Sequence, residues 1–104
     1  MPRYFIQLSY NGTTYNGWQV QDNTKNTIQH VLQEKLSVIF SEQIEVVGCG
    51  RTDAGVSAKD YYAHFDCLKT DLHLLDTNYV YKLNKILPFD IAIKKIYLVN
   101  ESAS

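Results

Sequence analysis

The sequence has few cysteines, no long apolar run and no surplus of positive charge. No stretch approaches the ~20 apolar residues that span a bilayer, and the N-terminal segment MPRYFIQLSYNG lacks the apolar core of a signal peptide. These absences argue against a membrane-spanning protein and against a secreted one. We therefore expect a cytoplasmic protein.

The cysteines of the chain are Cys49 and Cys67. Neither belongs to a Cys-x-x-Cys pair, which argues against a zinc knuckle. If strands over 44–49 and 60–66 pair as a hairpin, the two thiols lie several residue pairs apart, too far for a disulfide. We therefore expect two free, buried thiols.

Positive and negative charges nearly cancel, since 10 Lys+Arg stand against 11 Asp+Glu for a net charge of −1. Proteins that bind nucleic acid usually carry a basic footprint, because they neutralise phosphates. Binding of RNA would therefore need positive charge that is local, or that comes from outside this segment. The length of 104 residues and the hydrophobic content of 45% suffice for one small domain.

Hydrophobic periodicity divides the chain into six predicted elements. The patterns predict strands over 3–10, 44–49, 61–66 and 90–99 and helices over 27–40 and 77–87. The resulting order β-α-β-β-α-β predicts an α+β, ferredoxin-like fold, a four-stranded antiparallel sheet with two helices on one face. The other face has no predicted cover, and eight tyrosines are more than so small a core buries with every hydroxyl satisfied. We therefore expect the open face to be a binding surface or an interface.

Three local signals refine these elements. Asn26, followed three residues later by Gln29, predicts a capping box at the start of the first helix. Pro88 predicts the end of the second helix. In the last strand, DIAIKKIYLV, the apolar phase slips by one residue, which predicts a β-bulge near Lys94–Lys95.

The stretch GCGRTDAGVSA, which begins at Gly48, is the most unusual part of the sequence. It joins two predicted strands, and a turn uses glycines and an aspartate but needs no arginine. In an extended segment Arg51 and Asp53 leave the same face, and a nearby cation keeps a carboxylate ionised, as suits a nucleophile or a general base. The alternative is an ordinary turn aspartate that bonds its own backbone. Gly48, Gly50 and Gly55 would allow positive φ or close approach by another group.

A second unusual stretch, GWQVQ, lies in a long polar loop after the first predicted strand. Trp18 is interpreted either as a plug that packs the loop on the core or, together with Tyr15, as a stacking or positioning group. In the functional interpretation, Gln19 and Gln21 bond RNA or shape the catalytic loop. The sequence leaves both interpretations open.

Other carboxylates and histidines are interpreted as structural. Asp60 and Asp66 would be available as the second carboxylate of a glycosidase, but both are expected at the surface. His64 and Asp66 share a strand face, whereas His73 follows in a loop with no fixed relation to them, so we predict no metal site. The glycines of GCGRTDAG do not fit a phosphate-binding loop either.

Several stretches together resemble the tRNA pseudouridine synthase A family. GRTDAGVSA resembles its catalytic-loop motif, and LSYNGTTYNGWQVQ, NTIQHVLQEKL, AHFD and LNKILPFDIAI resemble further family motifs in the same order. The resemblance covers essentially the whole chain. It implies an enzyme that isomerises uridine to pseudouridine in the anticodon arm of tRNA and needs no cofactor.

The resemblance also assigns roles by motif position. Asp53 would be the catalytic aspartate, and Arg51 would help to hold the target nucleotide out of the stack. Thr52, Gln19 and Gln21 would contact the RNA. Loop-shaping roles would fall to Gly50, Gly55 and Trp18.

Two features depart from the family pattern. Ser57 stands where the family commonly has histidine, which affects any RNA contact from that position. Family members are more than twice as long, and their second domain supplies a substrate-stacking tyrosine and further basic residues. We therefore expect 1–104 to be the N-terminal catalytic-loop domain of a homodimeric enzyme, inactive alone.

Two other functions remain open from the residues alone. One is a stand-alone RNA-binding module that uses the open aromatic face without catalysis. The other is a small-molecule regulatory domain of ferredoxin-like type, which leaves GRTDAG without an explanation.

Overall fold

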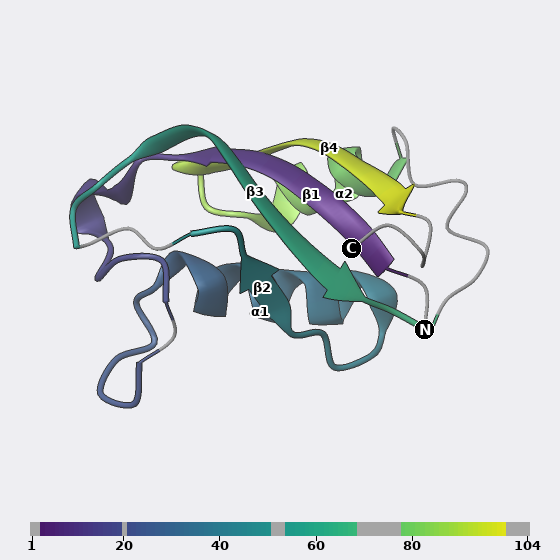
Figure 1. The fold of residues 1–104 in the computed structure, drawn as a ribbon, viewed down its shortest axis with the longest axis horizontal. Helices are drawn as coiled ribbons and strands as arrows, with labels where there is room; N and C mark the ends of the chain where they lie inside the picture. Colours follow the sequence, from purple (N-terminus) through teal and green to yellow (C-terminus); the bar gives the residue numbers. More distant parts are fainter. Residues whose placement is uncertain (1–2, 20, 51–53, 69–77, 100–104) are drawn as a thin grey trace.

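The computed structural model describes residues 3–19, 21–50, 54–68 and 78–99. In chain order the elements are β1 (Arg3–Tyr10), the short 3₁₀ helix η1 (Gly12–Thr14), α1 (Ile28–Phe40), β2 (Val46–Gly48), β3 (Ala58–Asp66), α2 (Asn78–Ile86) and β4 (Ile91–Val99). The four strands form one sheet in the order β2-β3-β1-β4, and every neighbouring pair is antiparallel (Figure 1). This confirms the predicted α+β, ferredoxin-like fold.

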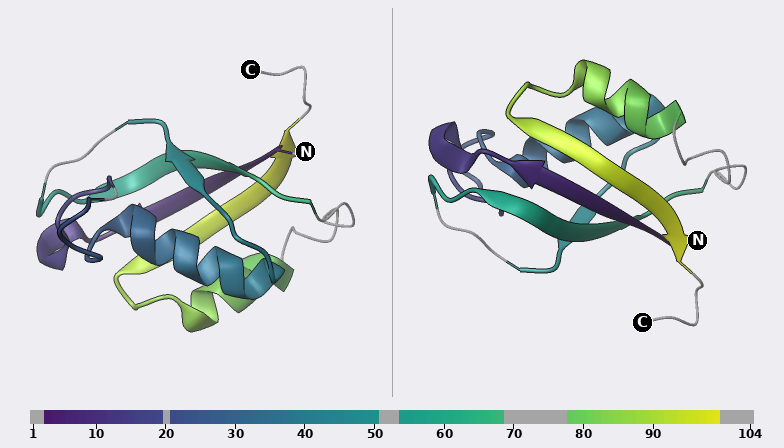
Figure 2. Two further views of the ribbon diagram at one scale, coloured as in Figure 1. Left: turned by 90° about the horizontal axis from the view of Figure 1, so that it is seen from below. Right: turned by 90° about the horizontal axis from the view of Figure 1, so that it is seen from above.

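Both helices cover the same face of the sheet, as the two opposite views in Figure 2 show. Along β1 the burial alternates without a break, so that every second side chain points into the layer between sheet and helices. The core side chains of the central strands are Tyr4, Ile6, Leu8, Tyr10, Tyr61, Ala63 and Phe65. The opposite face of the described strands carries the intervening, partly exposed residues and has no helix over it. No helix in these residues is long and apolar enough to cross a membrane.

Helix α1 packs its predicted stripe into the core but begins differently from the prediction. Its N-cap is Thr27, whose buried hydroxyl oxygen accepts a hydrogen bond from the His30 backbone N–H at 3.2 Å. The predicted capping box is therefore wrong. The Asn26 amide instead donates to the Thr14 carbonyl, and the Gln29 amide donates to the backbone of β2. These hydrogen bonds connect the start of α1 to η1 and to β2.

The predicted bulge in β4 is confirmed. Lys95 and Ile93 pair with adjacent residues of β1, so Lys94 is the extra residue of the bulge. The shift returns Ile96 to the core, where it is 2% exposed. Leu98 belongs to the same phase but is 57% exposed.

The remaining boundaries differ from the prediction by a few residues. β2 is shorter than the predicted 44–49, β3 begins three residues before the predicted 61–66, and α2 lies inside the predicted 77–87. Both cysteines are free, as predicted. Cys67 is buried and its thiol donates to a Glu42 carboxylate oxygen at 3.0 Å, but Cys49 is exposed, which corrects the prediction of two buried thiols.

Candidate functional site

The predicted catalytic loop joins β2 to β3. Arg51, Thr52 and Asp53 lie outside the described residues, so the site is built from the segments that flank them. These segments are 48–50, which ends β2, and 54–57, which leads into β3. Each flank is attached to the loop that follows β1.

The flank before Arg51 is attached through Tyr61. The Cys49 backbone N–H donates to the Tyr62 carbonyl at 2.9 Å, which extends the β2–β3 pairing by one step. The Tyr61 hydroxyl donates to the Gly50 carbonyl. Burial raises the pKa of Tyr61 to about 12, so this hydroxyl remains a donor at neutral pH.

Trp18 fills the space between this flank and the core. Its ring is 1% exposed and lies 4.4 Å from the ring of Tyr61, measured between centroids. Gly48 makes this packing possible, because a Cβ atom there would lie 2.2 Å from the Tyr61 hydroxyl oxygen and 2.4 Å from Trp18 Nε1. The burial of Trp18 favours the plug interpretation, in which the ring shapes the loop through Tyr61.

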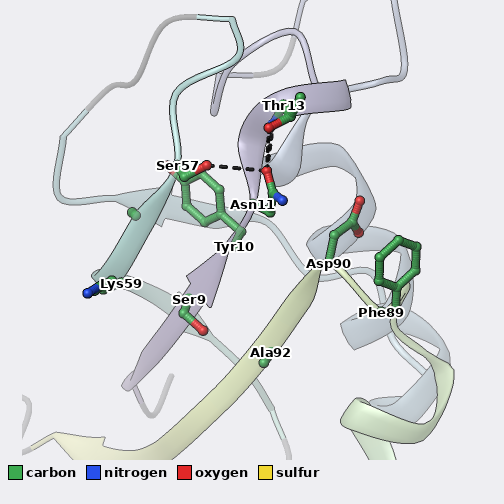
Figure 3. Close-up of a pocket in the computed structure, with 10 residues that line it drawn as sticks. Ser9, Tyr10, Asn11, Thr13, Ser57, Lys59, Phe89, Asp90 and Ala92 are labelled. Atoms are coloured by element: carbon green, nitrogen blue, oxygen red, sulfur yellow. Dashed lines mark hydrogen bonds between the residues drawn. The ribbon is translucent and has the colours of Figure 1, made fainter.

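The flank after Asp53 is attached to the same loop. Gly55 has a φ of 81°, a conformation that favours glycine, and its N–H donates to the Tyr15 carbonyl at 3.1 Å. Two residues later, the Ser57 hydroxyl oxygen accepts from the Gly12 N–H at 2.9 Å and lies 3.4 Å from Asn11 Oδ1 (Figure 3). Segment 15–18 thus contacts the loop on both sides of 51–53.

A hollow of about 770 Å³ opens beside this second attachment. Its lining residues are Ser9, Tyr10, Asn11, Thr13, Ser57, Ala58, Lys59, Phe89, Asp90 and Ala92 (Figure 3). The lining offers hydroxyls, one amine, one carboxylate and the fully exposed ring of Phe89. These groups suit a polar ligand with an aromatic part.

The other predicted binding and loop-shaping residues have different surroundings. Gln19 is exposed, and the Gln21 amide donates to the Asn16 carbonyl at 2.7 Å, so Gln21 braces its own loop. Gly50 lies in a bend, but its φ is not positive and a Cβ there would meet no atom of the described residues within 4 Å. Gly55 thus has the expected positive φ and Gly48 the expected close approach, whereas Gly50 shows neither among the described residues.

His64 and Asp66 lie on the open face of the sheet. Asp66 accepts two hydrogen bonds from Arg3, at 2.9 and 3.3 Å, and this pairing lowers the pKa of the carboxyl group. His64 stacks on Phe5, with centroids 5.8 Å apart, and its pKa is lowered by burial and then by Arg3. His73 lies outside the described residues, and the part of the chain that the structure describes brings no three His, Cys, Asp or Glu side chains together as possible metal ligands.

Sequence reasoning missed one residue beside the site. The carboxylate of Asp90, in the turn directly before β4, accepts a hydrogen bond from the Tyr15 hydroxyl at 2.7 Å. The position directly after Pro88 and Phe89 resembles an ordinary turn, so only the pairing of β1 with β4 reveals the contact.

No protein-family model matches the chain, but individual proteins do. The chain is 45% identical over 104 residues to tRNA pseudouridine synthase A of Bacteroides thetaiotaomicron, an alignment that covers 99% of this chain and 37% of that protein. The protein of the same name from Azobacteroides pseudotrichonymphae is 46% identical, with 99% and 40% covered, and that from Aquifex aeolicus is 42% identical, with 97% and 40% covered. The chain is therefore similar, over nearly its whole length, to proteins named tRNA pseudouridine synthase A.

The chain spans about two fifths of the length of these curated relatives. This similarity agrees with the resemblance found in the sequence motifs. The described residues bring parts of three of those motifs to one end of the sheet, namely 11–18, the flanks of 51–53, and 88–90.

Proposed function

We propose that the protein containing this chain isomerises uridine to pseudouridine in the anticodon arm of tRNA. In this proposal residues 1–104 form the N-terminal catalytic-loop domain of a cytoplasmic homodimer and are inactive alone. The names of the relatives support the reaction and the tRNA substrate. The observation that carries the proposal is the attachment of the loop on both sides of 51–53 to segment 15–18.

This attachment matters because the reaction needs a carboxylate in a fixed place. Pseudouridine forms when the bond between N1 and the sugar breaks, the uracil turns and C5 bonds to the same sugar carbon; a proton then leaves C5, and N1 gains one. We assign to Asp53 the role of nucleophile or base in this exchange. Holding the loop that carries such a group in one geometry increases the reaction rate, because misplacement of the reacting groups raises the activation barrier.

Arg51 has a separate role in the proposal. A base inside a stem or a stacked loop must leave its stack before an enzyme reaches it, at a cost of a few kcal/mol. A guanidinium group that occupies the vacated space offsets part of this cost. Thr52, Gln19 and Gln21 are proposed to contact the RNA nearby, and the exposed side chain of Gln19 is free to do so without unfolding the loop.

The open face of the sheet supports an RNA partner. Phe5 lies between His64 and Tyr97, with ring centroids 5.8 and 6.0 Å away, and Lys95 Nζ lies 5.5 Å from the centroid of Tyr97. Aromatic rings with a neighbouring cation suit unstacked bases and phosphates. Arg3 on the same face is paired with an acid, so we infer that more positive charge comes from the remainder of the longer protein.

The test of catalysis is Asp53→Ala in the full-length protein. We expect turnover of tRNA uridine to fall by about 10⁴-fold or more, as for other catalytic groups, while tRNA affinity changes little. Glu34→Ala is the matched control, because this exposed carboxylate lies on α1, on the helix-covered side of the sheet, and should leave turnover unchanged.

Two results would overturn parts of the proposal. Retained turnover in Asp53→Ala would remove the role of Asp53. A wild-type protein that binds tRNA with steep salt dependence but makes no pseudouridine would instead be a binding module.

A further inference from the structure

Tyr15 connects two parts of the chain that are far apart in sequence. Its hydroxyl donates to Asp90 Oδ1 at 2.7 Å, and its backbone carbonyl accepts from the Gly55 N–H at 3.1 Å. Gly55 follows Asp53 by two residues. A displacement of Tyr15 therefore acts directly on the loop segment next to Asp53.

Asp90 is itself held in place by two contacts. The backbone carbonyl of Asp90 accepts a hydrogen bond from the Asn11 N–H at 2.9 Å, and Oδ2 of its carboxylate lies 3.5 Å from the Thr14 hydroxyl oxygen. The start of β4 is thereby fixed to the loop after β1. Asp90 is in position to hold Tyr15 because two further groups of that loop hold Asp90.

The hydroxyl of Tyr15 stays protonated and can therefore donate a hydrogen bond. The residue is 7% exposed, and burial, followed by the hydrogen bond to Asp90 and its charge, raises the pKa of Tyr15 well above its ordinary value. The hydrogen bond to a charged acceptor is of the stronger kind. The Tyr15 hydroxyl therefore keeps its proton at neutral pH and remains available to donate to Asp90.

We propose that Asp90 and Tyr15 form a positioning pair that fixes the loop segment after Asp53 for the isomerisation. The inference rests on the proposed function and deepens it. Neither residue touches the reacting atoms in this proposal, since Asp90 acts through Tyr15 and Tyr15 acts through Gly55. The isomerisation therefore depends on the hydrogen bond between Tyr15 and Asp90, which affects Asp53 only through Gly55.

The experiment compares Tyr15→Phe, Asp90→Ala and Asp90→Asn in the full-length protein. Tyr15→Phe and Asp90→Ala should each lower kcat by about 10- to 100-fold, the range expected for a displaced catalytic group, with KM for tRNA little changed. Asp90→Asn keeps an oxygen acceptor for the Tyr15 hydroxyl, so it should retain more of kcat than Asp90→Ala. The double variant Tyr15→Phe/Asp90→Ala should be no slower than the slower single variant, because both remove the same hydrogen bond.

Ser37→Ala is the control for a loss of stability alone. The Ser37 hydroxyl donates to the Gln33 carbonyl and accepts from the Ile44 N–H, and it contacts none of the loop residues. This variant should lower Tm and leave kcat unchanged. If Tyr15→Phe and Asp90→Ala behave in the same way, the pair is only structural and the inference is wrong.

Amide hydrogen exchange gives a readout that does not depend on activity. Exchange at the Gly55 amide should accelerate in Tyr15→Phe and Asp90→Ala but not in Ser37→Ala, and unchanged exchange would overturn the inference. Loss of turnover in Asp53→Ala combined with normal kcat in both pair variants would reject the positioning role and keep the proposed function. Absence of pseudouridine formation by the wild-type full-length protein would reject the proposed function instead, and with it the catalytic consequence of the pair.

Discussion

Replacing Gly48 by alanine tests the attachment of the catalytic loop with a single methyl group. The new Cβ would lie 2.2 Å from the Tyr61 hydroxyl oxygen, 2.4 Å from Trp18 Nε1 and 2.7 Å from Trp18 Cε2. Atoms do not remain at these separations, so at least one ring must move. Trp18 is 1% exposed, so its movement requires the close-packed core around it to repack. Movement of Tyr61 would break its hydrogen bond to the Gly50 carbonyl.

The cost follows from known overpacking effects. Extra methyl groups in a well-packed core cost about 1–3 kcal/mol, and a contact with two aromatic rings places Gly48→Ala at the upper end of that range. Replacement of glycine by alanine also restricts the unfolded chain, which offsets about 0.4–1 kcal/mol. We therefore expect a net loss of about 2 kcal/mol in the free energy of unfolding, which corresponds to a fall in Tm of roughly 8 °C or more for a domain of this size.

Urea unfolding, followed by tryptophan fluorescence, measures this loss at the site itself, because Trp18 is the single tryptophan of the chain. Gly50→Ala is the matched control, since a Cβ there meets no atom of the described residues within 4 Å and the φ of Gly50 is not positive. Its unfolding midpoint should change little or rise slightly. Equal midpoints for Gly48→Ala and Gly50→Ala, with unshifted Trp18 emission, would mean that neither ring has to move to accommodate the added methyl group.

Three further predictions concern charge and pH. Because the pKa of Tyr61 is raised to about 12, above its ordinary value of about 10, its contribution to stability is complete below about pH 10 and is lost as the pH rises towards 12. Tyr61→Phe should flatten this loss in urea titrations across that range. Because the pKa of His64 is lowered, the folded state favours the neutral ring, and stability should fall as the pH drops below about 6.5. His64→Gln should reduce that fall in Tm between pH 8 and pH 5. Lys95→Ala in the full-length protein should weaken tRNA binding across sequences and lower the slope of log affinity against log salt by about one.

Patterns of apolar and polar residues within single elements predicted the strands and helices well. The alternation over 3–10 matches β1 at both ends, and the phase slip in the last strand predicts the bulge at Lys94. Both succeed because burial of one face fixes the side-chain direction at every position of a strand. The antiparallel sheet then follows from the β-α-β-β-α-β order of the elements.

Features that depend on tertiary contacts were not predictable in the same way. Asn26 and Thr27 are both suitable N-caps, and the choice of Thr27 is decided by the Thr14 carbonyl, which takes the Asn26 amide. Cys49 has the same strand phase as the exposed Glu45 and Val47, so its exposure depends on which face of the sheet the helices cover. The hydrogen bond between Tyr15 and Asp90 spans 75 positions and leaves no signal in either segment.

The strand order explains why motifs from three parts of the chain form one site. Tyr10, at the end of β1, pairs with Ala58 near the start of β3 and with Ile91 at the start of β4. Antiparallel neighbours of a central strand must begin where that strand ends. The loop after β1 therefore lies between the loop that enters β3 and the turn that enters β4, and it contacts both. A change near Asp90 therefore reaches the catalytic loop through residues 11–18. The buried aromatic residues of this otherwise polar loop, Tyr15 and Trp18, make the contacts that connect the two.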